Sequence, residues 1–423
     1  MAAAAERRRA WGVFAALAAG YSASQFYRAS PTVIAPDLMR DLALSAQAIG
    51  GVAGLFFLAV GLFQLPSGVL LDRFGPRKTM ACLLTVAVAG AIVFAAGGSA
   101  ATLGAGRALM GIGCAAALMG AMVVVGRWFP PEKFATMSGL MMGIGGIGVL
   151  MAASPLAYAT GAIGWRSAFL AAAGVTAVLA LILYAVVRDA PDSDGAAPEA
   201  LRETPGQVLQ GILTVMRDRR LWRIIAMQIS IYPSVMTVAG LWAGPYLADV
   251  HGLDTEARGK ALNVLFGALV IAPILFGPLD RIFNTRKRVV MASALTLSGT
   301  LLTLAFWPKP GLWQALALLF VLCIASPGSL VLHAHARATL PERLVGRGMT
   351  LQNMAAMGGI FLLQTATGLI IGSFARVGGA APEIAYRAAF GFLGVMLLLS
   401  LTIYAGAKDI RPRDVARRAV GSS

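Results

Sequence analysis

Residues 68–78 read GVLLDRFGPRK, and they join two long apolar stretches of the chain. These stretches, 48–71 and 79–99, are each long enough to cross the hydrocarbon core of a membrane as a helix, which takes about 20 apolar residues. The joining segment carries four charges and a Gly-Pro pair, so it is expected to form a turn at a membrane surface. A related segment, GPLDRIFNTRK, occupies residues 277–287. Its recurrence indicates a membrane protein built from two similar halves.

Composition supports a membrane protein over the whole length of the chain. Of its 423 residues, 58% are hydrophobic and only 13% are charged, whereas an average soluble domain has about 25% charged residues. The three cysteines lie inside apolar runs and show neither the spacing of a disulfide framework nor that of a zinc site. We therefore expect neither a metal site nor a cofactor.

Hydropathy predicts an all-α membrane protein with twelve transmembrane helices in two pseudo-symmetric bundles of six. The polar segment 188–220 divides the spans into an N-terminal bundle at 1–187 and a C-terminal bundle at 221–406, and a cytoplasmic tail follows at 407–423. The apolar run after the N-terminal arginines is longer than a secretory signal, so it is expected to be the first span. The predicted spans are 11–36, 48–71, 79–99, 101–126, 135–160, 165–187, 221–247, 258–279, 289–307, 311–335, 348–374 and 386–406.

The basic residues predict the orientation of the chain. Of 35 Lys and Arg residues, 26 fall on the side that holds both termini and the linker, and Arg28 alone falls within a span. Because cytoplasmic loops are enriched in Lys and Arg, both termini are predicted to lie in the cytoplasm, on the inner face of a cell (inner) membrane. The net charge of +16 then reflects contact with anionic lipid and implies no nucleic-acid partner. The remaining eight Lys and Arg residues are predicted on the side opposite the termini: Arg40, Arg107, Arg166, Arg258, Lys260, Lys309, Arg376 and Arg387.

The two halves repeat each other at offsets of 208 to 221 residues. Asp72-Arg73 is matched by Asp280-Arg281, and WRSAF at 165–169 is matched by YRAAF at 386–390. Each half contains an even number of spans, so both repeats enter the membrane in the same direction and are related by an axis along its normal.

The turn at 68–78 resembles the best-known signature of the major facilitator superfamily, in which a Gly, an Asp-Arg pair and a basic pair join spans two and three. The sequence RALMG at 107–111 resembles the second motif of this family. Together with the span count, the linker and the half-repeat, the resemblance covers essentially the whole chain. It implies a secondary transporter whose substrate site lies between the halves and opens alternately to each side. Span five departs from the family's proton-driven drug exporters, since GIGGIGVLMAASP at 143–155 lacks their Gly-Pro pair.

The cytoplasmic turn is a candidate gating motif. Asp72 could accept hydrogen bonds from helix N-terminal amides or pair with Arg127, while the basic residues face lipid headgroups. Such contacts would form only when the cytoplasmic side is closed, which would make them a latch for one of two states. Ordinary turn chemistry is the alternative. The residues assigned to the motif are Gly68, Asp72, Arg73, Gly75, Arg77, Lys78, Arg107, Asp280 and Arg281.

Arg28 is the candidate anchor for a substrate. An unpaired arginine near the middle of a bilayer costs at least about 2.5 to 3.5 kcal/mol unless water, a partner or a ligand receives it. All 19 acidic residues are assigned to loops, tails or span ends, so an anionic substrate is the most economical partner for its planar fork of donors. Tyr21 and Gln25 lie on the same polar stripe of the helix. A structural arginine held by carbonyls and water is the alternative.

The first span, with FYRASPTVIAPDL at 26–38, is similar to that of the organophosphate and organic-anion carriers of the superfamily. These carriers place an arginine eight residues before a proline, as Arg28 and Pro36 stand here. Span seven lacks the second arginine of the organophosphate carriers and has Met236 and Thr237 at the corresponding place. A small carboxylate with one strong anchor fits best.

Further polar residues are candidates for the cavity wall or for coupling. Tyr232, Trp242, Asn263 and Gln364 could line the site, or they could form interhelical contacts. His333 and His335 lie at the predicted cytoplasmic end of span ten, where histidine could couple protons to transport. Interfacial histidines without such a role are the alternative.

The sequence therefore predicts a secondary active transporter of a small organic anion, working by alternating access through proton symport or exchange and acting as a monomer. Two alternatives remain: an exporter of a metabolite or siderophore-like chelator, and a non-transporting membrane receptor or sensor on the same fold. An enzyme is a poor fit, because the sequence shows no nucleophile–base pair, metal-ligand cluster or phosphate loop.

Overall fold

The computed structural model describes residues 2–190, 219–340, 345–376 and 380–412, and within these ranges it contains helices and no β-strand. Most of the predicted linker and tail lies outside the described residues. The helices of the first half are α1 (Ala2–Ala29), α2 (Pro31–Asp41), α3 (Ala46–Ala96), α4 (Ala100–Cys114), α5 (Ala117–Trp128), α6 (Pro131–Met151) and α7 (Ser154–Val186).

The second half begins with span seven, which consists of α9 (Arg219–Gln228), α10 (Ile231–Thr237), the π-helix η1 (Val238–Trp242) and α11 (Ala243–Asp249). It continues with α12 (Thr255–Phe276), α13 (Leu279–Ile282), α14 (Lys287–Phe306), α15 (Leu312–Ile324), α16 (Gly328–Thr339), α17 (Val345–Gly372) and α18 (Glu383–Ala405).

Nine helical segments of the described residues are long and apolar enough to cross a membrane. Two of them, Ala46–Ala96 and Glu132–Val186, have 51 and 55 residues, about twice the length of one crossing. Each is interrupted by a glycine in the left-handed region, Gly75 or Gly164, both with φ of 78°, where the chain can reverse without a Cβ clash. With α1 and α2 as one further crossing, the helices are compatible with the twelve predicted spans.

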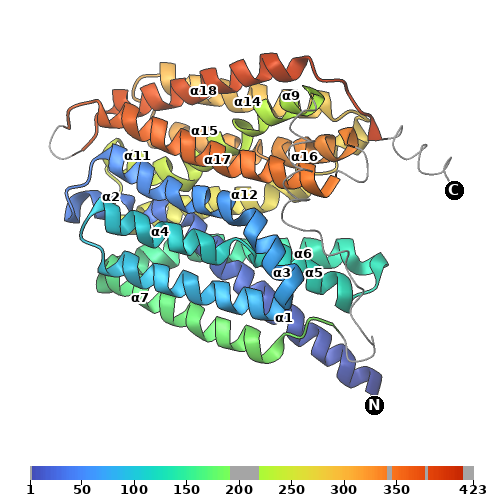
Figure 1. Ribbon diagram of the computed structural model, residues 1–423. Coiled ribbons are helices and arrows are strands. Elements are labelled where there is room, and N and C mark those ends of the chain that lie inside the picture. Colours follow the sequence, from blue (N-terminus) through green and yellow to red (C-terminus); the bar gives the residue numbers. More distant parts are fainter. Residues whose placement is uncertain (1, 191–218, 341–344, 377–379, 413–423) are drawn as a thin grey trace.

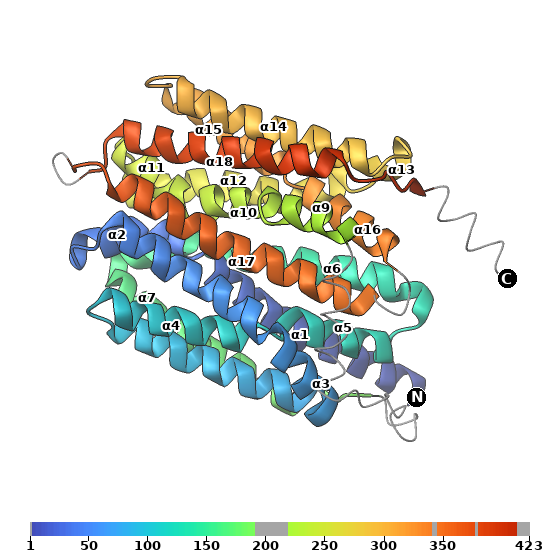
Figure 2. The same cartoon turned by 45° about the horizontal axis from the view of Figure 1, so that its top comes forward.

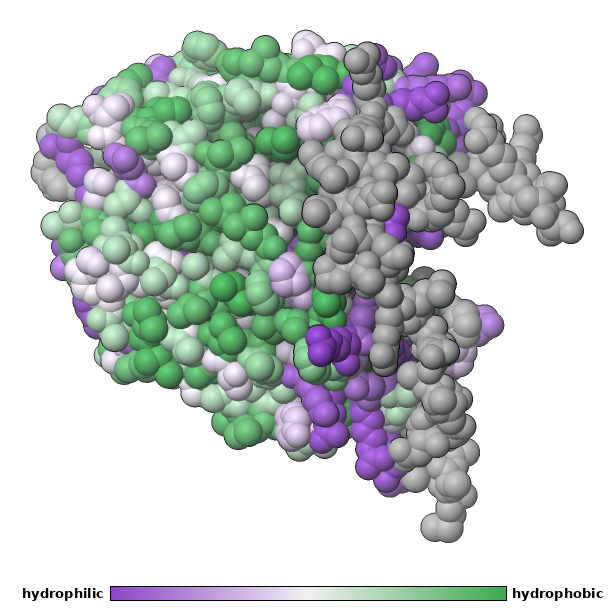
Figure 3. Space-filling view, in the orientation of Figure 1, coloured by the Kyte–Doolittle hydropathy of each residue, from purple (hydrophilic) through white to green (hydrophobic). Residues whose placement is uncertain are grey.

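The helices form two groups that lie side by side (Figures 1 and 2). The first half, blue to green, lies below the second half, yellow to red, in Figure 1. The start of α1 and the residues after α18 lie at one end of the bundle, which we call the terminal end. The loops after α2 and α11 lie at the other, the distal end. Apolar side chains cover the middle of the visible surface and hydrophilic ones gather toward both ends (Figure 3), as expected for a membrane-spanning protein.

The two halves are joined through their distal parts. At the extreme distal end, Arg258 of α12 lies 3.5 Å from Asp37 of α2, and its Nη2 donates to the carbonyl of Val33 at 3.1 Å. Asn263 of α12 donates to Ser154 of α7 at 2.7 Å. These hydrogen bonds and the ion pair connect side chains that a separation of the halves would expose to water.

Close helix contact extends this junction along α3 and α17. Gly50 lies against the backbone of Gln364, where a Cβ would meet the carbonyl oxygen, so the absence of a side chain permits the approach. Nearer the terminal end, Asn353 donates to Gln64 at 2.9 Å. Among the described residues, no hydrogen bond between side chains of the two halves lies closer to the terminal end than this one.

Two arginines near the ends of predicted spans are buried in the structure. Arg107 and Arg258, both predicted on the side opposite the termini, are 1% and 3% exposed. Neighbouring helices cover both side chains, and this burial cannot be predicted from the hydropathy of a single segment of the chain.

Candidate functional site

Span one is interrupted next to Arg28. Pro31 has no backbone N–H, so the carbonyl of Tyr27, four residues earlier, cannot make its helical hydrogen bond. Arg107 of α4 donates to this carbonyl from Nη1 at 2.6 Å, and its Nη2 lies 3.5 Å from the carbonyl of Ala53 in α3. Arg107 therefore serves as a structural group that holds the backbone beside Arg28, and the structure shows no contact between it and the turn at 68–78.

Arg28 lies where span one meets span seven. Its partly buried guanidinium interacts electrostatically with Tyr21 of α1 and Tyr232 of α10, and Tyr232 is within hydrogen-bonding reach. The Cζ atom lies 5.8 Å from the centre of the Phe57 ring in α3. Among the described residues, Nε of Arg28 and Oε1 of Gln25 are buried without hydrogen-bond partners. No described carboxylate pairs with the guanidinium, so the arrangement can accept an anion.

Span seven is irregular at this level. A π-helix such as η1 departs from regular helical bonding and is frequent at functional sites. Thr32 of α2 donates to the carbonyl of Ala239 across the junction between the halves, at 3.0 Å. Gln364 of α17 is fully buried, and its Nε2 lies 3.4 Å from the carbonyl of Met236. The irregular backbone is thus contacted by side chains from both halves.

The structure brings together some of the predicted binding residues and places others in the helix packing. Tyr21, Arg28 and Tyr232 form one cluster, with Gln25 one helical turn away from Arg28. Trp242 is 1% exposed and donates from its indole to Thr367 at 2.8 Å, which matches the interhelical alternative. Asn263 bridges the halves, and its Oδ1 is buried without a partner among the described residues.

The turn at 68–78 is held by a residue that the sequence analysis did not assign. Asp189, directly after α7, accepts a hydrogen bond from the backbone N–H of Arg77 at 2.7 Å and lies against Gly75. Arg127 contacts the carbonyl of Asp189 at 3.4 Å, not the side chain of Asp72. Asp72 is exposed and accepts no hydrogen bond from the described residues. Arg73 and Lys78 are exposed as well. Gly68 lies in the helix ahead of the turn.

The second half repeats this arrangement. Asn284 adopts a left-handed φ of 48° at the position of Gly75, which asparagine tolerates better than most residues. Asp409, after α18, accepts hydrogen bonds from Thr285 Oγ1 at 2.6 Å and from the backbone of Lys287 at 3.0 Å. Burial raises the pKa of Asp409, but these hydrogen bonds outweigh it and the net pKa lies below the usual range. Asp280 is buried 3.5 Å from Arg286, and Arg281 is exposed.

The two histidines contact neighbouring backbone. His335 has both ring nitrogens occupied, with Tyr404 Oη 2.7 Å from Nδ1 and the carbonyl of Lys408 2.9 Å from Nε2. Because a carbonyl can only accept, Nε2 carries the proton and Nδ1 accepts from the tyrosine. Nδ1 of His333 lies 2.8 Å from the carbonyl of Ser329. His335 therefore ties α16 to the segment after α18.

Sequence reasoning missed Arg107 as a backbone clamp and Asp189 and Asp409 as caps. A local signal existed for the first, because a proline at position 31 predicts an unpaired carbonyl at position 27. The matched positions of the two aspartates, each following the last helix of its half, could have been found by extending the repeat comparison past the spans.

Residues 17–272 match the family model of the Major Facilitator Superfamily, which is more than half of the 423-residue chain. The protein belongs to this superfamily. It is therefore a multi-pass membrane transporter rather than an enzyme, and the prediction from the turn, the span pattern and the half-repeat is confirmed.

Two curated relatives and one solved structure illustrate the similarity. The hexuronate transporter of Escherichia coli K12 is 24% identical over 413 residues, covering 92% of this chain and 93% of that protein. A probable L-galactonate transporter of the same organism is 28% identical over 263 residues, covering 57% and 55%. The crystal structure of a bacterial homolog of the human lysosomal transporter Spinster, inward-facing and unoccupied, has a TM-score of 0.76 at 18% identity, covering 94% and 96%. This last likeness shows the fold.

Proposed function

We propose that this transporter moves a small organic anion whose carboxylate is bound by Arg28. The observation that carries the proposal is the guanidinium at the meeting point of the two halves, with tyrosines around it and no described carboxylate to balance its charge. A carboxylate can accept two parallel hydrogen bonds from the planar fork of an arginine. A bound anion would also remove the cost of holding an unpaired cation in the bilayer.

The surroundings of Arg28 favour a hydroxylated acid, such as a sugar acid. Tyr21, Tyr232 and Gln25 offer hydroxyl and amide groups within the same cluster, and the Phe57 ring offers an apolar face. Hexuronate and galactonate, named in the relatives, are carboxylates that carry several hydroxyls. A single positive anchor with neutral polar neighbours suits such a monoanion better than it suits a phosphate ester of higher charge.

The positions of the contacts between the halves support transport by alternating access. The halves are tied at the distal end by Asp37 with Arg258 and by Asn263 with Ser154. With the basic terminal end assigned to the cytoplasm, this geometry corresponds to a state closed to the outside. The exposed Asp72 then fits a latch that is unmade in this state and forms when the cytoplasmic side closes. Proton symport and exchange are both compatible with this cycle.

Ligand titration of the purified protein tests the anchor. Galactonate and glucuronate are expected to bind and to raise the melting temperature, whereas uncharged galactose is expected to bind weakly. A charge-assisted hydrogen bond is worth about 1.5 to 3 kcal/mol, or roughly ten- to a hundredfold in affinity. Arg28→Lys should therefore weaken binding by roughly that factor, because lysine keeps the charge but loses the fork. Arg28→Ala should abolish measurable binding.

The matched control is Arg337→Ala, which removes an exposed arginine from α16 and should leave affinity unchanged. Equal affinity in the wild type and both Arg28 variants would exclude the anchor. A collapse of the melting temperature in Arg28→Ala without ligand would support a structural arginine instead.

A further inference from the structure

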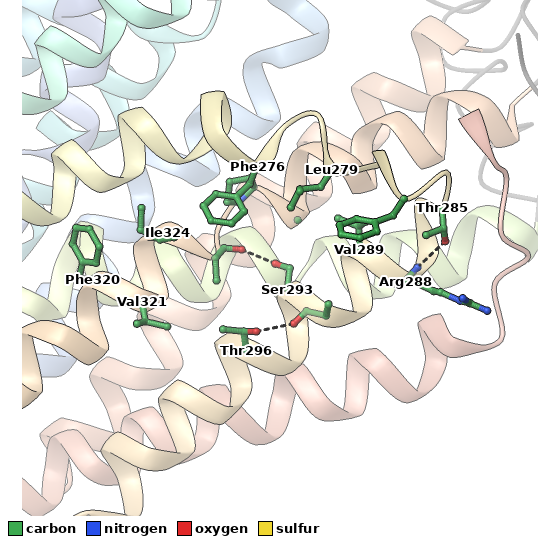
Figure 4. A pocket seen from close by; sticks show the side chains of 15 residues that line it. Phe276, Leu279, Thr285, Arg288, Val289, Ser293, Thr296, Phe320, Val321 and Ile324 are labelled. Carbon is green, nitrogen blue, oxygen red and sulfur yellow. Dashed lines mark hydrogen bonds between the residues drawn. The ribbon is translucent and has the colours of Figure 1, made fainter. Parts of the chain in front are cut away.

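A cavity of about 590 Å³ lies in the second half of the molecule, and Arg28 is not among its lining residues. It is bounded by the end of α12, by α13 and α14, and by the junction of α15 with α16. Figure 4 shows Phe320 and Val321 at one end of this groove and Thr285 and Arg288 at the other. All of its lining residues come from the second half, so it is not part of the space between the halves.

The groove exists because span ten is broken beside α14. α15 ends at Ile324 and α16 begins at Gly328, after Pro327, which cannot continue the hydrogen bonding of α15. The missing side chain of Gly328 leaves room for Ser293. The break therefore leaves a recess between α14 and span ten.

The recess offers almost no polar group to a ligand. Ser293 donates its hydroxyl to the carbonyl of Ala325 at 2.6 Å, and Thr296 donates to the carbonyl of Ala292 at 3.0 Å (Figure 4). Thr285 donates to Asp409, which lies outside the lining. A water-soluble ligand of this size would need several convergent hydrogen-bonding groups. The lining is instead mostly aliphatic and aromatic, and some of it is open to the surroundings, with Phe283 65% and Val321 41% exposed.

A single charged residue, Arg288, lies at one end of this apolar recess. Arg288, in the first turn of α14, is exposed, and its guanidinium makes no hydrogen bond or ion pair with the described residues. From Arg288 to Thr296 the groove follows α14 for roughly 12 Å of helical rise. The site therefore combines a cation at the terminal end with an apolar channel leading away from it, toward the level of Phe320.

We propose that this groove binds one anionic phospholipid, with an acyl chain between α14 and span ten and the phosphate on Arg288. The groove lies on the membrane-spanning part of the protein, where lipid is the surrounding solvent, and its charge lies at the end that we assign to the cytoplasm. Anionic lipids are concentrated in that leaflet and attract arginine at the headgroup level. Only this assignment of sides rests on the proposed orientation; the binding chemistry is independent of Arg28.

The test measures lipid binding to the purified full-length chain in detergent, by native mass spectrometry and by melting temperature. Dioleoyl phosphatidylglycerol is expected to remain bound as one molecule and to raise the melting temperature more than dioleoyl phosphatidylcholine does. Glycerol phosphate, which has the phosphate but no acyl chain, is expected to have no effect. Stabilisation by glycerol phosphate equal to that by the lipid would overturn the proposal in favour of a soluble phosphate ligand.

Two pairs of variants locate the site. Arg288→Gln should remove the preference for phosphatidylglycerol over phosphatidylcholine, whereas Arg281→Gln, the same change at an exposed arginine outside the groove, should keep it. Ala292→Phe fills the groove and should abolish retention of the lipid. Leu295→Phe, on the exposed face of α14 but outside the lining, should not.

Unchanged lipid retention in Ala292→Phe would overturn the proposal. So would a wild-type dimer that Ala292→Phe converts to monomer, because the groove would then be covered by a second copy of the chain. Loss of galactonate binding in Arg28→Ala with lipid retention intact would keep this proposal separate from that for Arg28.

Discussion

Arg28 and Arg107 lie in the same half of the bundle and differ in what receives their hydrogen-bond donors. The two terminal nitrogens of Arg107 contact the carbonyls of Tyr27 and Ala53, and its Cζ lies 4.5 Å from the centre of the Phe56 ring. Arg28 has neutral hydroxyl groups beside it, a buried Nε without a described partner and no described carboxylate. Nε of Arg107 is likewise buried without a described partner. The two residues therefore differ in their terminal nitrogens: those of Arg107 are bound by backbone carbonyls, whereas no described backbone carbonyl accepts from Arg28.

The difference shows how to interpret a buried arginine in a transporter. Burial alone does not mark a binding site, because a guanidinium can stabilise a break in a helix by binding free carbonyls. Counting the acceptors around each of its donors separates the two roles. Arg258 is the intermediate case, since it contacts both a carbonyl and the carboxylate of Asp37 across the halves.

The largest expected effect on stability comes from Arg107→Met. The change leaves the carbonyl of Tyr27 with fewer donors in a buried place, which costs about 1 to 3 kcal/mol, and it should lower the melting temperature clearly. Arg28→Met should leave the melting temperature of the ligand-free protein nearly unchanged while binding is lost. Thermal unfolding of both variants in the same detergent checks the contrast. Equal losses of stability would mean that Arg28 is structural too.

The next effect concerns the distal junction. Asp37→Asn weakens the contact of α2 with Arg258 and should shift the protein toward a state that is open at the distal end. Ala157 is buried against Gly259 of α12. A cysteine placed at position 157, with the native cysteines replaced, should therefore react severalfold faster with an impermeant maleimide when Asp37→Asn is present than when Asp37 is retained.

Lys260→Gln is the control for this measurement. It breaks the ion pair with Glu256, in which both side chains are 70% exposed, and exposed pairs contribute little. Labelling that is equally fast in wild type and Asp37→Asn would show that the ion pair does not hold the halves together.

The smallest effects on stability are expected at Asp72, in the turn at 68–78, and at Asp189, which accepts a hydrogen bond from that turn. Asp72→Asn should leave the melting temperature unchanged, because the side chain is exposed, but it should slow initial uptake into proteoliposomes and favour the state closed at the distal end. Asp189→Asn, which weakens the acceptor of the Arg77 N–H, should instead cost about 1 kcal/mol of stability, as for other helix caps. Unchanged uptake by Asp72→Asn would leave the turn a structural feature only.

Hydropathy and spacing indicated the helical membrane fold, the two related halves and the polar stripe that carries Arg28, and the resemblance of the turn at 68–78 to a known signature indicated the family. These features depend on local composition and on periodicity, because a helix must present about 20 apolar residues to lipid wherever the rest of the chain lies. The candidate cavity residue Tyr232 was also singled out from span seven, although its place beside Arg28 could not be known from spacing.

Only the tertiary structure decided which polar groups meet. Tyr27 and Arg107 are 80 residues apart in the chain, and Arg77 and Asp189 are 112 apart, so no local pattern specifies their contact. The same holds for Trp242, whose hydrogen bond to Thr367 matches the interhelical alternative. Hydrogen bonding between distant helices depends on how closely their backbones approach and on the direction of each side chain. Those two quantities are fixed by the packing of the whole bundle and are not encoded in any single span.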